Sequence, residues 1–187
     1  MEKTELFVRI PKERIGVLIG QDGRIKREIE SRTGTRLLID SETGEVTIEV
    51  AENPLGGLQA LEVVKAIGRG FSPERAFRLF EEDQYLDIIE IKDFVGDSEK
   101  AMQRMRGRVI GESGKMRRTI EQMTGAYVSV FGKTVSIIGD PEQIRTARTA
   151  IQMLLSGSEH SSVYRFLERE KAKKKNVIFP RMGVGRE

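Results

Sequence analysis

Apolar residues recur at two spacings in the first half of the chain, one typical of strands and one of helices. Leu6, Val8 and Ile10 alternate with polar residues, which predicts a half-buried strand. Later apolar residues at helical spacing predict helices that are separated by glycine and proline breaks. The predicted order is a strand at 6–10, a helix at 11–19, a glycine turn at 20–23, a helix at 24–33, strands at 36–40 and 46–50, and a helix at 54–67.

The second half of the chain repeats this order after a short connecting helix that begins at Ser72 and Pro73. The same spacing rules apply, with glycine and proline again marking the breaks. Its predicted elements are a strand at 85–91, helices at 98–109 and 115–124, a hairpin of strands at 127–131 and 134–138, a helix at 141–154, and a further helix at 161–175.

Some side chains are assigned to helix starts and to buried faces. Asn53, Ser98 and Asp140 stand where helices begin, and such side chains favour capping of the free backbone amides. In the helix after Asn53, apolar residues at helical spacing form one face that is expected to be buried. These residues are Leu58, Leu61, Val64 and Ile67.

The chain contains an internal repeat. The segment 17–30 returns as 108–121, with the same Gly-x-x-Gly turn followed by the same kind of basic helix. The interval of 91 positions also carries Thr33 onto Thr124. A register that holds across a loop, a helix and a helix stop predicts a duplicated module, and each copy is long enough to bury a modest core. We therefore expect two small domains.

The composition is typical of a soluble globular protein and excludes several kinds of chemistry. Of 187 residues, 38% are hydrophobic and 33% are charged, and no apolar stretch is long enough to span a bilayer. The sequence has no cysteine and one histidine, which excludes disulfides and zinc sites built from cysteines or several histidines. With so few nucleophiles and bases, we expect no enzyme activity, no metal and no cofactor. Cytoplasmic localisation and no membrane contact are expected.

Positive charge gathers around the two glycine turns, although the net charge is only +3. The positions of the charges are more informative than their sum, because phosphate binding depends on local clusters. Basic residues also crowd the segment 165–175. The basic residues directly after the turns are Arg24, Lys26 and Arg27 in the first copy and Lys115, Arg117 and Arg118 in the second.

Each Gly-x-x-Gly turn joins two short helices, and this context favours phosphate binding. The glycines let the backbone approach a phosphate, while the next helix offers free amides and the positive end of its dipole. The alternative is a tight turn between helices that binds nothing. A nucleotide-binding P-loop is excluded, because Val109 stands where that motif needs glycine and Met116 where it needs serine or threonine.

The repeated order of strand, helix, Gly-x-x-Gly turn, helix, strand, strand and helix resembles the type I KH domain. The resemblance implies an α+β fold of two tandem type I KH domains, each a three-stranded antiparallel sheet packed against three helices, plus a C-terminal helix. It divides the chain into a first KH domain at 1–70, a connecting segment at 71–84, a second KH domain at 85–157, and a C-terminal helix with a basic tail at 158–187. In that family, the turn clamps about four single-stranded nucleotides beside an apolar groove for bases.

This resemblance assigns roles to residues in both copies. The first clamp is Gly20, Gln21, Asp22 and Gly23, and the second clamp is Gly111, Glu112, Ser113 and Gly114. The implied groove residues are Leu18, Ile19, Ile29 and Leu37 in the first copy and Val109, Ile110, Ile120 and Val128 in the second, with burial in a core as the alternative. Replacing Gly111 and Gly114 with Asp is expected to abolish most of the affinity for single-stranded RNA and to leave the fold intact.

Both clamps carry an acidic residue, Asp22 or Glu112, where KH domains often carry lysine or arginine. A carboxylate beside a phosphate is repulsive, and the basic residues downstream offset this repulsion. The first basic helix also carries Glu28, which Thr119 replaces in the second copy. We therefore expect the second module to bind single-stranded RNA, and the first to bind RNA or to face protein.

Two KH modules followed by the segment 157–167 resemble the partner-of-Nob-one family of small-subunit ribosome assembly factors. That resemblance implies binding near the 3′ end of small-subunit rRNA, work beside the processing endonuclease, and contacts with other ribosomal or assembly proteins. Eukaryotic members have an additional N-terminal region that this sequence lacks, so an archaeal member is the better match. The alternatives are a general mRNA-binding regulator and a protein scaffold whose clamps no longer hold RNA.

Overall fold

The computed structural model describes residues 3–178 and confirms the expected α+β architecture of two three-stranded antiparallel sheets with helices. The sheets have strand orders β1-β3-β2 and β4-β6-β5, so the last strand of each hairpin is central in its sheet. Residues 179–187 of the predicted basic tail lie outside the described residues.

The first module contains the predicted strands, helices and glycine turn. Its elements are β1 (Thr4–Arg9), α1 (Lys12–Ile19), η1 (Gln21–Gly23), α2 (Arg24–Thr33), β2 (Thr35–Ile39), β3 (Glu45–Val50) and α3 (Pro54–Gly68). Ile48 of the central strand lies opposite both Leu6 and Leu37. Ile48 and Leu37 are buried against the helices, which makes the inner face of this sheet one wall of the first core.

The connecting segment and the second module follow in the predicted order, with one additional short helix, α5. Their elements are α4 (Pro73–Ala76), η2 (Phe77–Phe80), β4 (Tyr85–Glu90), α5 (Lys92–Val95), α6 (Glu99–Ile110), η3 (Glu112–Gly114), α7 (Lys115–Thr124), β5 (Tyr127–Phe131), β6 (Thr134–Gly139), α8 (Pro141–Leu155) and α9 (His160–Ile178). The last helix begins at His160, one residue before the predicted start.

Two of the three predicted helix caps form side-chain hydrogen bonds. Asp140 accepts a hydrogen bond from the Gln143 amide at 2.8 Å, and the Gln143 side chain accepts one from the Asp140 amide at 2.9 Å. Ser98 accepts a hydrogen bond from the Ala101 amide. The prediction for Asn53 is wrong, because its side chain makes no capping hydrogen bond; only its backbone carbonyl takes part in the first turn, accepting from the Gly57 amide at 3.3 Å.

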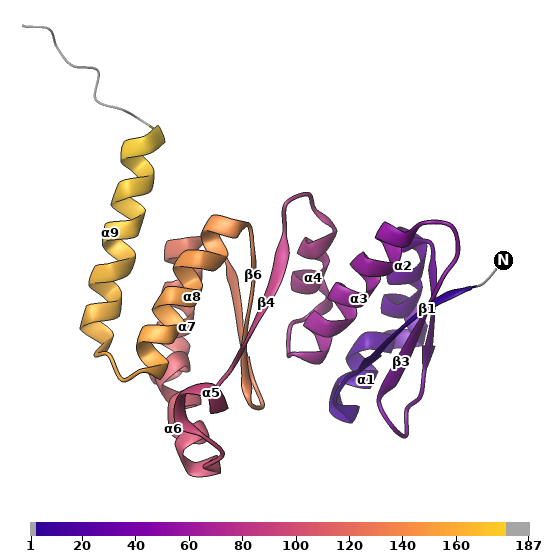
Figure 1. Ribbon diagram of the computed structural model, residues 1–187, viewed down its shortest axis with the longest axis horizontal. Coiled ribbons are helices and arrows are strands. Elements are labelled where there is room, and N and C mark those ends of the chain that lie inside the picture. The colour runs from indigo at the N-terminus through magenta and orange to yellow at the C-terminus, as the bar shows by residue number, and fades with distance from the viewer. Residues whose placement is uncertain (1–2, 179–187) are drawn as a thin grey trace, which may run out of the picture.

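The helices of the first module lie between the two sheets (Figure 1). The outer face of the second sheet therefore packs against the first module, and every residue of β6 is buried. Val135 and Ile137 of β6 face the second core, while Ile138 belongs to the first core. A strand that is buried on both faces is usually a continuous run of apolar residues. Strand β6 is an exception, because Thr134 and Ser136 lie on the face that packs against the first module.

Arginines of the first module secure this interface between the modules. Arg69 Nη1 donates to Thr134 Oγ1 at 3.1 Å, and the Arg69 carbonyl accepts a hydrogen bond from Ser129 Oγ at 2.8 Å. The guanidinium groups of Arg69 and Arg14 lie 5.6 and 5.7 Å from the centre of the Phe131 ring. Burial lowers the pKa of Arg14 from its usual value, and its guanidinium donates at 2.8 Å to the carbonyls of Ile67 in α3 and Phe71 in the connecting segment. Polar and stacking contacts thus fix the position of one module against the other.

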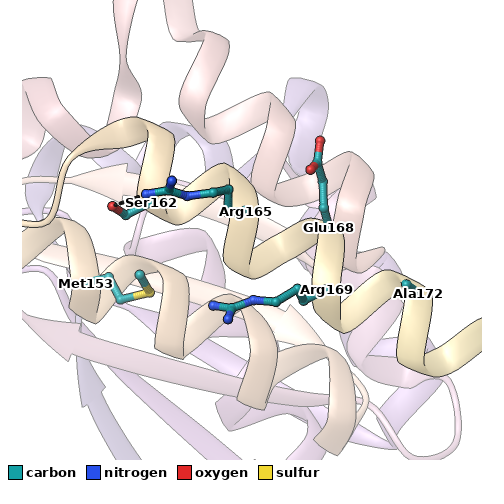
Figure 2. A pocket seen from close by; sticks show the side chains of 6 residues that line it. All are labelled: Met153, Ser162, Arg165, Glu168, Arg169 and Ala172. Atoms are coloured by element: carbon teal, nitrogen blue, oxygen red, sulfur yellow. Dashed lines mark hydrogen bonds between the residues drawn. The ribbon is translucent and has the colours of Figure 1, made fainter.

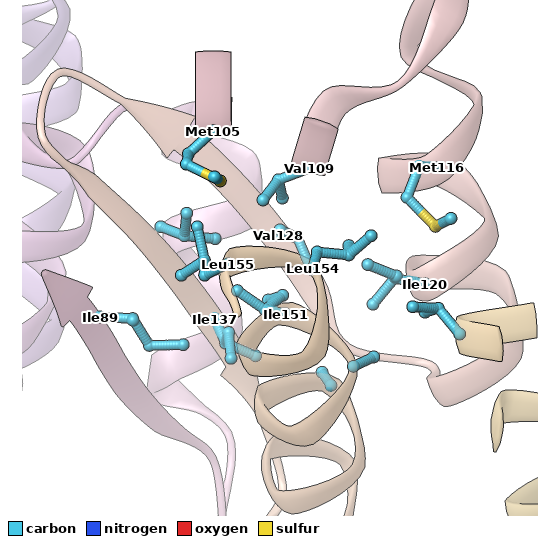
Figure 3. Close-up of a cluster of buried hydrophobic side chains, with 14 of the residues drawn as sticks. Ile89, Met105, Val109, Met116, Ile120, Val128, Ile137, Ile151, Leu154 and Leu155 are labelled. Atoms are coloured by element: carbon cyan, nitrogen blue, oxygen red, sulfur yellow. The ribbon is translucent and has the colours of Figure 1, made fainter. Parts of the chain in front are cut away.

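The second core lies between sheet β4-β6-β5 and helices α6–α8, and α9 covers those helices from the other side (Figures 1 and 3). Val163 and Leu167 of α9 are fully buried in this core. Helix α9 therefore covers the helical layer of the second module, much as the second sheet covers that of the first.

The predicted buried face of α3 is wrong at Leu58. Val64 and Ile67 are fully buried, whereas Leu58 is 54% exposed. The buried face is instead centred on small residues that let the helix approach the sheet closely: a Cβ added at Gly57 would lie 2.5 Å from Val50 Cγ2. Helical spacing identified an apolar stripe, but the small residues determined which side of the helix lies against the strands.

We expect Ile67→Ala to destabilise the protein by roughly 2–5 kcal/mol, because it removes buried methyl groups and leaves a cavity. Leu58→Ala in the same helix is the matched control and should change the free energy of unfolding by less than about 0.5 kcal/mol. Urea unfolding followed by circular dichroism gives both values. Equal costs for the two substitutions would contradict the orientation of α3.

Candidate nucleic-acid interface

The two Gly-x-x-Gly turns have the same backbone conformation. Gly20 and Gly111 have φ/ψ of 72°/174° and 75°/175°, a region open almost only to glycine. The third residue of each turn is left-handed although it is not glycine, with φ of 55° at Asp22 and 52° at Ser113. Each turn leads directly into a helix of 10 residues, so the free amides of α2 and α7 point toward the turn. Free helix amides beside a glycine turn are the feature on which the predicted phosphate binding depends.

The first glycine of each turn is required for steric reasons as well. A Cβ at Gly20 would lie 2.5 Å from Ile25 Cγ1, and a Cβ at Gly111 would lie 2.8 Å from both the backbone nitrogen and the Cβ of Met116. The expectation that Gly111 can be replaced by Asp without disturbing the fold is therefore wrong. A clean test of the second clamp must change the residues between the glycines.

An arginine four residues after the second glycine closes each turn. Arg118 Nη1 donates to the Ser113 carbonyl at 2.6 Å, and Arg27 Nη1 donates to the Asp22 carbonyl at 2.5 Å. Both arginines are exposed, so they add positive charge next to the turn as well as rigidity. Lys115 and Arg24, each the first residue of its helix, are also exposed. These groups offset the acidic residues of the clamps.

The other predicted basic residues are each engaged by a glutamate four positions later in the same helix, a pairing that was not predicted. Glu121 forms an ion pair with Arg117, and Glu30 lies 3.3 Å from the Nζ of Lys26. The same carboxylates accept hydrogen bonds from the outer strands of the sheets, at 2.9 Å from the Leu37 amide and 3.4 Å from the Val128 amide. The available signals were the spacing of four residues, which places Glu30 beside Lys26 and Glu121 beside Arg117 on one side of a helix, and the repeat, because both glutamates occupy equivalent positions.

The connecting segment contributes two arginines to the second site, and these were also missed. Arg75 forms an ion pair with Glu121, and its guanidinium lies 4.5 Å from the centre of the Tyr127 ring. Arg78 lies 4.8 Å from the same ring and donates to the Gly125 carbonyl at 2.7 Å. Arg75 lines two grooves, of 390 and 420 Å³, which lie along the edge of β5 and the end of α7. Only tertiary contacts bring these residues beside the second clamp.

The predicted apolar grooves are wrong for most of their side chains. Val109 and Ile120 are fully buried and Val128 is 2% exposed; Figure 3 shows them in the second core. Leu18, Ile29 and Leu37 are buried in the first core. Only Ile110 and Ile19, each the last residue before its turn, remain partly exposed. The helices of each module present these faces to a sheet, and burial of aliphatic side chains is favourable there.

A separate groove of 590 Å³ lies between α8 and α9 (Figure 2). Arg169 extends across it toward Met153, while Arg165 donates to the Ser162 hydroxyl and Glu168 points away. None of its lining residues belongs to either clamp. The basic residues that line this groove belong to α9, and the groove is separate from both glycine turns.

Two structural features are absent from the described residues 3–178. No group of three or more His, Asp or Glu side chains in this part of the chain is placed to hold a metal ion. No helix within it is long and apolar enough to cross a membrane.

Two family models match the chain at the positions of the two modules. Residues 5–66 match the model of the KH domain. Residues 85–172 match a model of the eukaryotic-type KH domain, KH-domain type I, that is specific to the second KH domain of PNO1. The second match includes the first part of α9.

Relatives from archaea and eukaryotes resemble nearly the whole chain. A KH domain-containing protein of Methanocaldococcus jannaschii is 45% identical over 181 residues, which cover 95% of this chain and 79% of the relative. The RNA-binding protein pno1 of Dictyostelium discoideum is 29% identical over 84% of this chain and 67% of its own.

Solved structures with the same fold come from Pyrococcus horikoshii. The crystal structure of Dim2p is 56% identical and has a TM-score of 0.84 over 89% of this chain and 99% of the other. Dim2p in a complex with a/eIF2alpha and rRNA is 55% identical, with a TM-score of 0.86 over 91% of this chain and 96% of the other.

We expect Gly111→Ala to destabilise the protein by about 1–3 kcal/mol, because alanine is strained in this backbone conformation and its Cβ meets Met116. The matched control is Gly107→Ala, four residues earlier in α6, where the added Cβ has no neighbour within 4 Å. That change should stabilise the protein by roughly 0.5–1 kcal/mol, since alanine favours the helix. Thermal and urea unfolding measure both, and a stabilising Gly111→Ala would contradict the geometry of the turn.

Proposed function

This chain belongs to the family of two-KH-domain proteins that includes archaeal Dim2p and the PNO1 proteins, and from this we propose that it binds single-stranded RNA as a small-subunit ribosome assembly factor. The observation that carries the proposal is the second clamp. There a glycine turn, the first amides of α7, and the exposed cations Lys115 and Arg118 converge. Together they form a site for the sugar-phosphate backbone.

Base recognition would take place beside the clamp, along the edge of β5. This strand lies at the edge of its sheet, so its outer backbone groups face the groove. Glu121 accepts from the Val128 amide there, and Arg75 and Arg117 hold its carboxylate in place. Fixed donors and acceptors at a strand edge can read the hydrogen-bonding edge of an unstacked base, whereas the phosphate contacts carry no sequence information.

The second module is proposed as the stronger RNA site. Each clamp carries one acidic residue, Asp22 or Glu112, but the helix after the first clamp also carries Glu28, where the second copy has Thr119. The connecting arginines Arg75 and Arg78 lie beside the second clamp, where they add positive charge. The first clamp, with Gly20, Gln21 and Gly23, is proposed as a weaker RNA site or a protein contact.

The relatives support a role in ribosome assembly. A complex of P. horikoshii Dim2p contains rRNA and a/eIF2alpha, which supports rRNA and a protein of the a/eIF2alpha type as partners. We propose that the chain binds near the 3′ end of small-subunit rRNA in the cytoplasm and assists the processing endonuclease without a catalytic role of its own. A general mRNA-binding regulator would instead bind many RNAs alike, and a protein scaffold would bind none of them.

We expect Ser113→Asp to weaken the binding of an RNA oligonucleotide that copies the 3′ end of small-subunit rRNA. A like-charge pair costs about 1 kcal/mol at 4 Å in water, which corresponds to roughly a fivefold loss of affinity. Ser113→Asn is the matched control, since asparagine tolerates the same left-handed conformation without the charge. Fluorescence anisotropy measures both, and Gln21→Asp, which adds one carboxylate between the glycines of the first clamp, should have a smaller effect. Unchanged binding by Ser113→Asp would contradict the second clamp.

The basic residues of α7 are expected to differ in their salt dependence. Replacing Lys115 and Arg118 with Ala should flatten the slope of log affinity against log salt by about 1.4, because each neutralised phosphate of a single strand adds roughly 0.7. Arg117→Ala should flatten it less than either of these residues alone, since Glu121 already neutralises its charge. Titrations at several salt concentrations give the slopes. A larger effect of Arg117 would show that its ion pair opens when RNA binds.

A further inference from the structure

A groove of 490 Å³ on the side of α3 is unrelated to either clamp. It lies between the first turns of α3, the end of η2, and the turn that leads into β4. Its lining residues are Leu55, Leu58, Gln59, Glu62, Leu79, Phe80, Glu81, Glu82, Asp83, Gln84, Tyr85 and Leu86. We refer to it as the acidic groove.

The acidic groove gathers much of the apolar surface that the protein leaves exposed. Six large apolar side chains are exposed among the described residues, and three of them line this groove. These are Leu55, Leu58 and Tyr85, which are 66%, 54% and 53% exposed. Helix α3 is therefore apolar on two sides, one buried against its sheet and one open to solvent. Clustered apolar exposure of this kind marks a contact surface, whereas scattered single residues do not.

The rim of this groove is negatively charged. Glu81, Glu82 and Asp83 are consecutive and exposed, and within residues 3–178 none of the three forms an ion pair. Glu62 on α3 faces the same space and is paired with Lys65, also on α3. These carboxylates surround the apolar floor of the groove with negative charge. Such a surface favours a partner that carries positive charge.

The groove is already formed in the free chain. Leu79 is 6% exposed and anchors the turn in the first core, and Arg78 Nε donates to Gln84 Oε1 at 2.8 Å across it. A preformed surface loses little conformational entropy on binding. The acidic rim repels phosphates, so RNA does not fit here, and the basic clamp lies on other elements of the structure.

We propose that the acidic groove binds an amphipathic helix of another protein that carries leucine-like side chains on one face and lysines or arginines beside them. Leu55 and Leu58 are one helical turn apart and form a ridge against which a second helix can pack. The basic side chains of that helix would lie against Glu81, Glu82 and Asp83. This site gives the protein a second, RNA-independent point of attachment within an assembly.

The test uses the full chain and a fluorescent model peptide of about four helical turns, with leucines on one face and lysines on the others. A second peptide has glutamate in place of every lysine. The groove variants are Leu55→Ser with Leu58→Ser, and Glu81→Gln with Glu82→Gln and Asp83→Asn. Phe7→Ser is the matched control, because Phe7 is 61% exposed on β1, outside the groove.

We expect the lysine peptide to bind the natural chain and Phe7→Ser equally, and both groove variants at least about tenfold more weakly. The glutamate peptide should not bind, and RNA affinity should be the same in all variants, which separates this site from the clamp. Equal binding of the lysine peptide to all variants overturns the proposal. So does self-association in light scattering that the leucine changes abolish, because the occupant would then be a second copy of the chain.

Discussion

The arrangement of the whole protein depends on the burial of the second sheet on both of its faces. One face closes the core of its own module, and the other packs on the helices of the first module, so that β6 has no exposed residue. A domain of this size buries only a modest core of its own. Packing the second sheet on the helices of the first module buries additional apolar surface in both modules. The modules are therefore stacked in a fixed register instead of being joined by a flexible linker.

This packing makes the two glycine turns unequal although their backbones match. The connecting segment has to run along the second module, and this brings Arg75 and Arg78 onto Tyr127 and Glu121. The clamps are equivalent in the turn, in the arginine that closes it, and in the glutamate that reaches the edge strand. Duplication supplied two similar sites, and the interface between the modules added positive charge to one of them.

The sequence alone predicted the features that depend on neighbours in the chain. Strand alternation, glycine stops, the caps at Ser98 and Asp140, and both Gly-x-x-Gly turns are set by local backbone preferences and by residues three or four positions away. The repeat register made these assignments stronger, because each element was seen twice. The order of elements and the two sheets followed from the same patterns.

The tertiary structure alone decided which side of an element is buried and which distant residues meet. Periodicity placed Leu58 inside, but the close approach of Gly57 to Val50 turned it outward, and Val109 and Ile120 lie in a core instead of an open groove. The ion pair of Glu121 with Arg75 depends on packing across 46 positions of the chain, whereas its ion pair with Arg117 is local, at i,i+4 spacing within α7. Contacts between residues far apart in the sequence depend on the global fold, and the local spacing of residues does not predict them.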